Sequence, residues 1–456
     1  MTGIRGWLRT AIRTLKLSRL SIVLLLTGLV LLVGTPLVST QLPGTRRPTP
    51  AGDSGQGRVG GQRTGSAREN AIEAAQRRLR DLPKDWPTWA QLGSAYVEQA
   101  RITADPSWYP KAEEALRRSL DLNSSTNWQA MAGMGSLANA RHDFAAARDW
   151  GLRAERINPQ AGSVHGVLVD AYTQLGDYDE ARAAVQRMLD VEPGVPSFTR
   201  ASYDFEQHGQ VTEAREALNR ALAESTDPAD IAFCHRYLGE LAFNNGDPGE
   251  ALRQYDAGLA ANPADPQSHA GRAKALAALG RTTDALADYA RAAQALPLPE
   301  LLVEYGDALS VAGRTGEAQQ QYDLVAATRK LLTANGVADH LTAATYLADH
   351  GKPAEALTEA QAEWAARHSV LAADALAWAL HRNGRDAEAL GYAEQATRLG
   401  WRNATFYYHR GVIRNALGDR DQARDDLSLA LEINPHFDVR QAPTARELRD
   451  SLGGPR

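Results

Sequence analysis

An alanine recurs at a nearly constant interval through most of this 456-residue chain. Ten such alanines, from Ala112 to Ala423, are separated by 35, 34, 33, 37, 34, 33, 38, 33 and 34 residues. A period of this length is typical of supersecondary units that stack on their neighbours. The period therefore predicts one long repeat array in place of two or three separate globular domains.

Composition and turn residues predict that each unit is a pair of helices. Alanine and leucine dominate, aromatic residues make up 7% of the chain, and the alternating Val/Ile/Thr-rich runs that mark strands are missing. Where the first helix of a unit should end, a glycine can adopt the left-handed conformation that stops it. These glycines are Gly176, Gly209, Gly246, Gly280, Gly313, Gly351, Gly384 and Gly418. We expect an all-α solenoid of about ten helix pairs.

The repeats resemble the tetratricopeptide repeat (TPR) family. The block Trp89-x-x-Leu92-Gly93-x-x-Tyr96 matches the opening signature of a TPR, and the pattern recurs at 237–263 and 408–435. This resemblance covers about residues 69–452 and implies a right-handed superhelix whose first helices line a concave, peptide-binding groove. The chain is also similar to bacterial membrane-anchored TPR proteins of uncharacterised role, a likeness that names no ligand.

Capping helices are expected at both ends of the array. Residues 68–85 read as an N-terminal capping helix, 86–438 as the TPR array, and 439–456 as a C-terminal capping helix and tail. In such a stack we expect each pair to bury its apolar side only against the next pair, which leaves a long curved surface for a guest chain.

The first residues carry a membrane signal. Residues 1–19 hold Arg5, Arg9, Arg13, Lys16 and Arg19 and no acidic residue, and residues 20–38 are uncharged. As a helix, this uncharged stretch would reach roughly 28 Å, which is close to the hydrocarbon thickness of a bilayer. We therefore predict a transmembrane helix or signal anchor at 20–38. Residues 39–67 are rich in Gly, Pro, Ser and Thr, which indicates a disordered linker.

The charge distribution predicts where the array lies relative to the membrane. Basic residues are more numerous before the apolar stretch than after it, which favours a cytoplasmic amino terminus and an extracytoplasmic TPR body on a single-pass membrane protein. A cleaved signal peptide, which would leave the body secreted, is the alternative.

Several function classes find no support in the sequence. The net charge of −5 and the absence of clustered Lys/Arg in the repeats argue against nucleic acid as a partner. The single cysteine, Cys234, cannot form an intrachain disulfide. There is no His-Glu-x-x-His helix, Gly-x-Ser-x-Gly elbow, Walker loop or cysteine pair. We accordingly predict no catalytic residue, metal ligand or cofactor.

The TPR resemblance implies which side chains face the groove. The inward positions of the first helices hold aromatic residues mixed with charged ones, and such mixtures give a peptide both contact area and directional anchors. The candidate groove residues are Tyr203, Phe233, Arg236, Glu240, Phe243, Lys274, Trp378, His381 and Tyr408. The alternative is that some of them pack between neighbouring repeats. No repeat has the Lys and Asn of the carboxylate clamp that binds chaperone tails.

These features favour a membrane-anchored scaffold that binds a protein or peptide in its groove, for assembly of an envelope complex. Two alternatives remain. One is an envelope enzyme or specificity subunit that acts on a polymer, and the other is a soluble cytoplasmic adaptor.

Overall fold

The computed structural model describes residues 61–453, which form 22 α-helices and no strand. The expected all-α repeat architecture is therefore confirmed. Each helix within this range is too short or too polar to cross a membrane. The predicted span at 20–38 and the basic segment at 1–19 lie outside the described residues.

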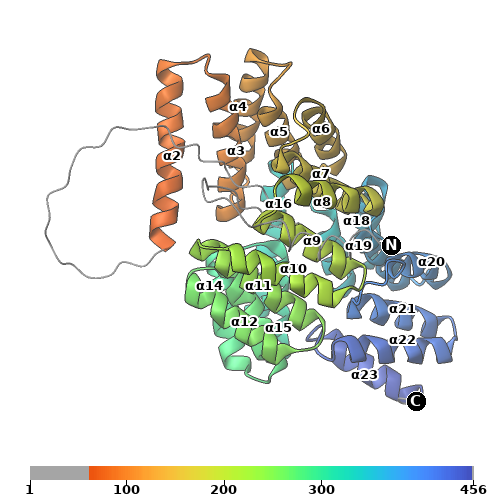
Figure 1. Ribbon diagram of the computed structural model, residues 1–456. Helices are drawn as coiled ribbons and strands as arrows, with labels where there is room; N and C mark the ends of the chain where they lie inside the picture. Colours follow the sequence, from red (N-terminus) through yellow and green to blue (C-terminus); the bar gives the residue numbers. More distant parts are fainter. Residues whose placement is uncertain (1–60, 454–456) are drawn as a thin grey trace, which may run out of the picture.

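The array consists of ten antiparallel helix pairs, as the alanine period predicts (Figure 1). The first helix of each pair faces the inside of the coil and the second faces outward. The pairs are α3 (Trp86–Thr103) and α4 (Trp108–Leu122), α5 (Trp128–Ala140) and α6 (Phe144–Ile157), α7 (Gly162–Leu175) and α8 (Tyr178–Val191), α9 (Val195–Gln207) and α10 (Val211–Glu224), α11 (Pro228–Asn244) and α12 (Pro248–Ala261), α13 (Pro266–Ala278) and α14 (Thr282–Ala295), α15 (Pro299–Val311) and α16 (Thr315–Ala334), α17 (His340–Asp349) and α18 (Pro353–Ala366), α19 (Val370–Arg382) and α20 (Asp386–Ala396), α21 (Ala404–Ala416) and α22 (Arg420–Ile433).

A further helix lies at each end of the array. Helix α2 (Gly61–Asp81) packs on α3 through the buried side chains of Ile72 and Leu79. It begins seven residues before the expected start at 68, so the linker expected at 39–67 ends earlier than its composition indicated. Helix α23 (Gln441–Ser451) packs on α22, where the C-terminal capping helix was expected.

Small residues allow the two helices of a pair, and neighbouring pairs, to approach closely. A Cβ atom at Gly239 on α11 would lie 2.8 Å from the Tyr255 ring, and one at Gly271 on α13 would lie 2.3 Å from it. The ring of Tyr255 is fully buried between these helices. Packing at native density therefore requires glycine at both positions.

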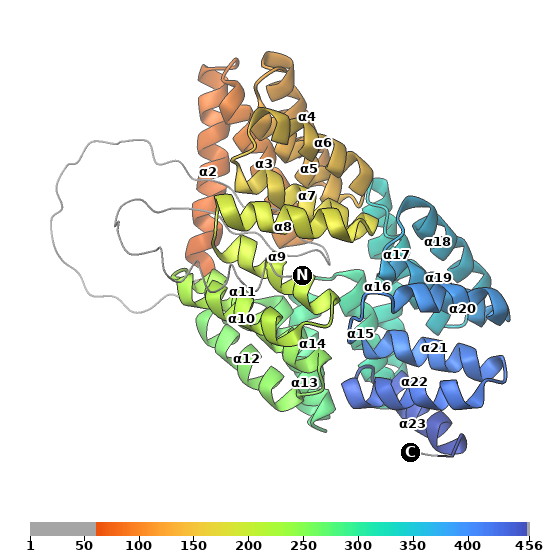
Figure 2. The ribbon, with the colours of Figure 1, turned by 45° about the vertical axis from the view of Figure 1, so that its right-hand side comes forward.

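The coil closes on itself along a line that we call the seam. Turns within the second to fifth pairs contact loops that lie almost 200 residues later, as the views in Figures 1 and 2 show where the later helices return beside the earlier ones. Residues His142 and Ala338 are 196 positions apart, Tyr178 and Val370 are 192 apart, and Phe243 and Asn434 are 191 apart. One turn of the coil therefore takes about 5.6 repeats of 34 residues.

Backbone and side-chain groups both bond across the seam. The amide of His368 donates to the carbonyl of Leu175 at 3.1 Å, and the amide of Val370 donates to the Tyr178 hydroxyl at 2.9 Å. The side-chain amide of Asn434 donates to the carbonyl of Phe243 at 2.8 Å. The expectation that each pair buries surface only against the next pair is therefore wrong: loops from successive turns of the coil also pack together.

Candidate functional site

One predicted groove residue lies in the seam. The ring of Tyr203 on α9 is 9% exposed and meets the Trp401 ring edge-on, with the ring centroids 5.8 Å apart. Trp401 belongs to the loop between α20 and α21, which returns from the next turn of the coil. Tyr203 is therefore covered by the chain itself and not presented to a guest, because the coil closes at this point.

Three further candidates form an aromatic cluster between the ninth and tenth pairs. Trp378 is 4% exposed and stacks on His409 at 4.1 Å, and its indole nitrogen donates to Asp349 at 2.8 Å. Tyr408 is buried against Trp378, while His381 is partly buried and pairs with Asp386. Trp378 and Tyr408 thus pack between repeats, which was the alternative interpretation of their inward positions.

The other five candidates lie along α11 and α13. The Arg236 guanidinium stacks over Phe233 and Tyr237, with its carbon 5.2 and 4.4 Å from the ring centroids, and lies 3.6 Å from a Glu240 oxygen. Arg236 is buried, and burial raises the pKa of Glu240. These residues form a compact cation–π and ion-pair group on the inner face.

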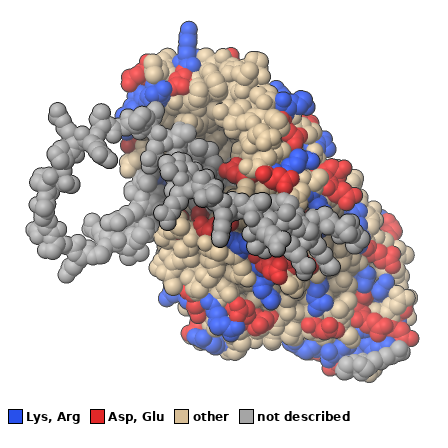
Figure 3. Space-filling view, in the orientation of Figure 1, with Lys and Arg blue, Asp and Glu red and all other residues tan. Residues whose placement is uncertain are grey.

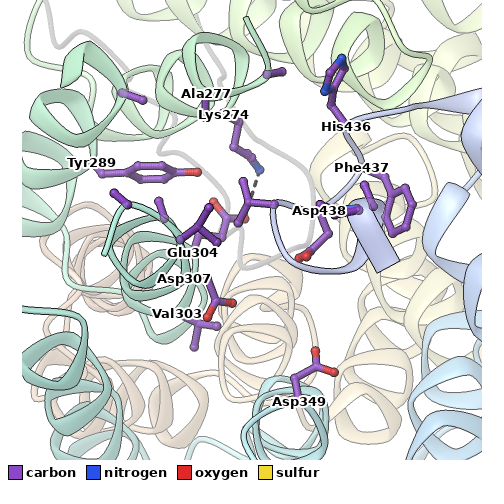
Figure 4. Close-up of a pocket in the computed structure, with 18 of the residues that line it drawn as sticks. Lys274, Ala277, Tyr289, Val303, Glu304, Asp307, Asp349, His436, Phe437 and Asp438 are labelled. Atoms are coloured by element: carbon purple, nitrogen blue, oxygen red, sulfur yellow. Dashed lines mark hydrogen bonds and ion pairs between the residues drawn. The ribbon is translucent and has the colours of Figure 1, made fainter. Parts of the chain in front are cut away.

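Phe243 and Lys274 line a cavity of about 460 Å³ (Figure 4). The first helices of four consecutive pairs, α11, α13, α15 and α17, form its walls together with α14 and residues 435–446. Its apolar surface includes Ala277, Val303 and Phe437. A volume of about 300–1,000 Å³ with apolar walls and a few polar groups is characteristic of ligand sites.

Carboxylates outnumber cations around this cavity. Five acidic side chains line it, against Lys274 and Arg446; they are Glu300, Glu304, Asp307, Asp349 and Asp438. The ammonium of Lys274 donates to Glu304 at 3.1 Å, which neutralises one carboxylate (Figure 4). Arg446 donates to the carbonyl of Pro435. The cavity is therefore acidic after its internal pairs have formed.

Two further carboxylates of the cavity, Asp307 and Asp438, also have defined hydrogen-bond partners. Burial alone would raise the pKa of Asp307, but hydrogen bonds with His350 and Tyr322 bring it below its usual value. Asp438 accepts backbone hydrogen bonds from the amides of Arg440 and Gln441, both at 2.7 Å.

Glu300 differs from the other carboxylates. Its Oε2 atom is buried and has no hydrogen-bond partner among the described residues. Burial raises the pKa of Glu300 to about 8, with further contributions from Asp339 and Glu304, while Lys274 acts in the opposite direction. A buried carboxylate oxygen without a donor is unfavourable until a partner reaches it.

The C-terminal segment closes one side of the cavity. The guanidinium of Arg440 donates to Asp307 at 3.1 Å and contacts the ring of His350 at 2.8 Å, 133 and 90 positions away in sequence. Gln441 donates to Asp349 at 3.2 Å. The C-terminal capping segment therefore does more than cover the last pair, because it also ties the end of the array to the seventh and eighth pairs.

The sequence contained a signal for part of this site that the groove positions did not use. Glu300, Glu304 and Asp307 stand at intervals of four and three residues, so they share one face of α15. No sequence pattern indicates that residues 435–446 also line the cavity, because their position depends on how far the coil has turned by the end of the array.

Acidic and basic side chains are interspersed on the face shown in Figure 3. Within residues 61–453, no three His, Cys, Asp or Glu side chains come together in a way that could hold a metal ion.

Sequence profiles described as tetratricopeptide repeat match residues 107–162, 167–230, 238–298 and 404–437. Superkiller complex protein 3 of Mus musculus is 23% identical over 263 residues, which are 56% of this chain and 16% of that protein. Among solved structures, the APC/C hetero-tetramer Cut9–Hcn1 aligns with 81% of this chain and 76% of its own at 14% identity and a TM-score of 0.43. A thermophilic TPR protein of Thermus thermophilus aligns with 41% of this chain and 99% of its own at 20% identity and a TM-score of 0.36.

Proposed function

Because this chain carries tetratricopeptide repeats, we propose that it is a scaffold that binds a segment of another protein on the inner face of its coil. The observation that carries the proposal is the cavity, whose walls come from the first helices of four consecutive pairs. Apolar side chains there supply contact area, and the carboxylates and Lys274 supply directional contacts. The seam supports the same function, because it holds the inner face in a fixed shape and so lowers the entropy lost on binding.

A photocrosslinker placed on each side of the coil tests this proposal. We expect a benzophenone side chain in place of Val303, which lines the cavity, to give a discrete crosslinked partner in cells that express the chain natively. The same group in place of Glu216, exposed on the outer helix α10, is expected to give none. Equal crosslinking from both positions, or none from Val303, would count against a binding site on the inner face.

We also propose that this scaffold is tethered to a membrane and acts in an envelope assembly. This proposal rests on the uncharged stretch at 20–38 and on the basic residues that precede it. We expect alkaline carbonate to leave the full chain in the membrane pellet and to release a variant that lacks residues 20–38. Release of both forms would show that the stretch is not an anchor.

A further inference from the structure

We propose that the cavity beneath residues 435–446 binds the side chain of a lysine or arginine in the partner segment, together with an adjacent apolar residue. This inference rests on the proposed function and specifies the chemistry of the partner. It follows from the shape of the cavity, from its excess of carboxylates and from the unpartnered oxygen of Glu300.

The excess of carboxylates over cations in the cavity favours a positively charged side chain of the partner. Of the five carboxylates, Glu304 is paired with Lys274 and Asp307 with Arg440. The remaining three, Glu300, Asp349 and Asp438, have no cation in hydrogen-bond contact among residues 61–453. Asp349 and Asp438 are instead held by neutral donors, namely Trp378, Gln441 and backbone amides. An acidic peptide would therefore meet repulsion, whereas an ammonium or guanidinium group would find acceptors.

The position of Glu300 makes it the main acceptor. Glu300 and Glu304 are one helical turn apart on α15, and both line the cavity. A lysine ammonium that reached the Oε2 atom of Glu300 would satisfy a buried acceptor that residues 61–453 leave unpaired. The apolar walls at Ala277, Val303 and Val311 suit the aliphatic stem of the same side chain and a neighbouring Val or Leu.

The cavity is better suited to a peptide than to a free amine because of where it lies. It is built into the inner face formed by the first helices, and Phe243 and Lys274 at its edge connect it with the Arg236 and Glu240 group on α11. An extended segment that runs along the inner face can insert one side chain into the cavity and still contact this second group.

A peptide library measures this preference directly. The full-length chain is incubated with an immobilised library of random hexapeptides, and the bound sequences are read. We expect enrichment of Lys or Arg beside Val, Leu or Ile. Replacement of the central lysine by acetyl-lysine in a selected peptide is expected to weaken binding by roughly tenfold or more, because the charge is lost while the stem remains.

Two variants connect the preference to the cavity. Glu300→Gln and Glu304→Gln should reduce affinity for a selected lysine peptide by roughly tenfold, whereas Glu317→Gln should leave it unchanged. Glu317 is the matched control, because it lies in the same helix pair but pairs with Arg314 on the exposed outer surface. Circular dichroism should show full helicity for all three variants.

Proton release provides a readout that a purely structural role would not produce. A cation beside Glu300 lowers its raised pKa, so binding near pH 7 should release a proton from the wild-type chain and less from Glu300→Gln. Asp339, Glu304 and Lys274 face the same carboxyl and remain in both proteins. Calorimetry in buffers of different ionisation enthalpy measures the difference.

The possible outcomes separate this inference from the proposed function. Enrichment of acidic peptides, or lysine peptides whose binding ignores Glu300→Gln, would overturn the inference while leaving inner-face binding intact. Competition by free cadaverine at the concentration of the peptide would show that the site takes amines and not a protein segment. Loss of the crosslink at Val303 would instead overturn the proposed function.

Discussion

Replacing Gly176 by alanine should destabilise the folded chain by about 3 kcal/mol, whereas the same change at Gly313 should cost about 1 kcal/mol. Both glycines stop the first helix of a pair with a left-handed backbone, at φ +88° and +78°. The strain of placing a Cβ in that conformation is therefore common to both variants. The difference in destabilisation between the two variants therefore measures how much the contacts across the seam contribute to stability.

The surroundings of the two glycines account for this difference. A Cβ atom at Gly176 would lie 2.5 Å from the carbonyl oxygen of His368 and 3.0 Å from the amide nitrogen of Ser369. Both are backbone atoms of the next turn of the coil, which cannot move aside as a flexible side chain could. A Cβ atom at Gly313 would meet no other part of the described chain within 4 Å. The alanine at position 176 must therefore push the two turns apart.

Thermal unfolding followed by circular dichroism gives the order of stability, and small-angle scattering gives the shape. We expect Gly176→Ala to lower the unfolding temperature more than Gly313→Ala and to increase the radius of gyration, because the seam opens. Gly280→Ala is a second control, since Gly280 also has a left-handed backbone and an added Cβ there would have no neighbour within 4 Å among residues 61–453. Equal losses in all three variants would mean that the seam contributes nothing to stability.

The same glycines show how far the sequence determines this fold. All eight glycines expected to end a first helix have positive φ. A left-handed backbone at the end of a helix favours glycine because glycine has no Cβ atom, so these positions can be predicted from the sequence alone. In the second pair, His142 takes this position at φ +63°, and its Nδ1–H donates to the carbonyl of Ala338 across the seam at 3.0 Å. No local pattern indicates that histidine, because its partner is 196 residues away.

The closure of the coil could not be predicted from the period alone. It results from small rotations added over more than five pairs and from α16, which is 20 residues long where the other second helices have 11 to 15. A resemblance between repeats defines each unit but not the angle accumulated along the stack. The contacts that bury Tyr203 therefore have no counterpart in the sequence pattern.

The repeat pattern predicts only part of the candidate site, because it does not give the angle accumulated along the coil. Inward positions on the first helices selected Phe243 and Lys274, and both side chains line the cavity. The same rule also selected Trp378 and Tyr408, which are buried because neighbouring repeats and the ring of Phe437 cover them. A position in a repeat gives the direction of a side chain, but whether solvent or another segment lies there depends on the whole coil.

Removing the cation of the buried Arg200–Asp170 pair should destabilise the chain by about 3–5 kcal/mol. Arg200 on α9 is 1% exposed and bonds both oxygens of Asp170 on α7, with Nε–Oδ1 at 2.8 Å and Nη2–Oδ2 at 2.7 Å. Arg200→Met retains most of the packing volume but leaves a buried carboxylate without its cation. In contrast, Arg281→Met, which removes an exposed pair with Asp284, should produce no measurable change.

A double variant separates the charge from the packing. In Arg200→Met combined with Asp170→Leu, neither charge of this pair remains, and we expect this protein to be more stable than Arg200→Met alone. The free energy of unfolding is measured by urea denaturation for four proteins: the wild type, Arg200→Met, Asp170→Leu and the double variant. If the double variant lost the sum of the two single effects, the pair would make no coupled contribution.

The loss in Arg200→Met should also depend on pH. Burial raises the pKa of Asp170, and Arg200 opposes this shift, so its removal raises the pKa further. An acid whose folded pKa exceeds its unfolded value binds an extra proton in the folded state between those two values, so stability falls as pH rises through this window. The loss of unfolding free energy in Arg200→Met relative to the wild type should therefore be smaller at pH 4.5 than at pH 7. A deficit that stayed constant between these values would show that lost packing, and not the unpaired carboxylate, causes the destabilisation.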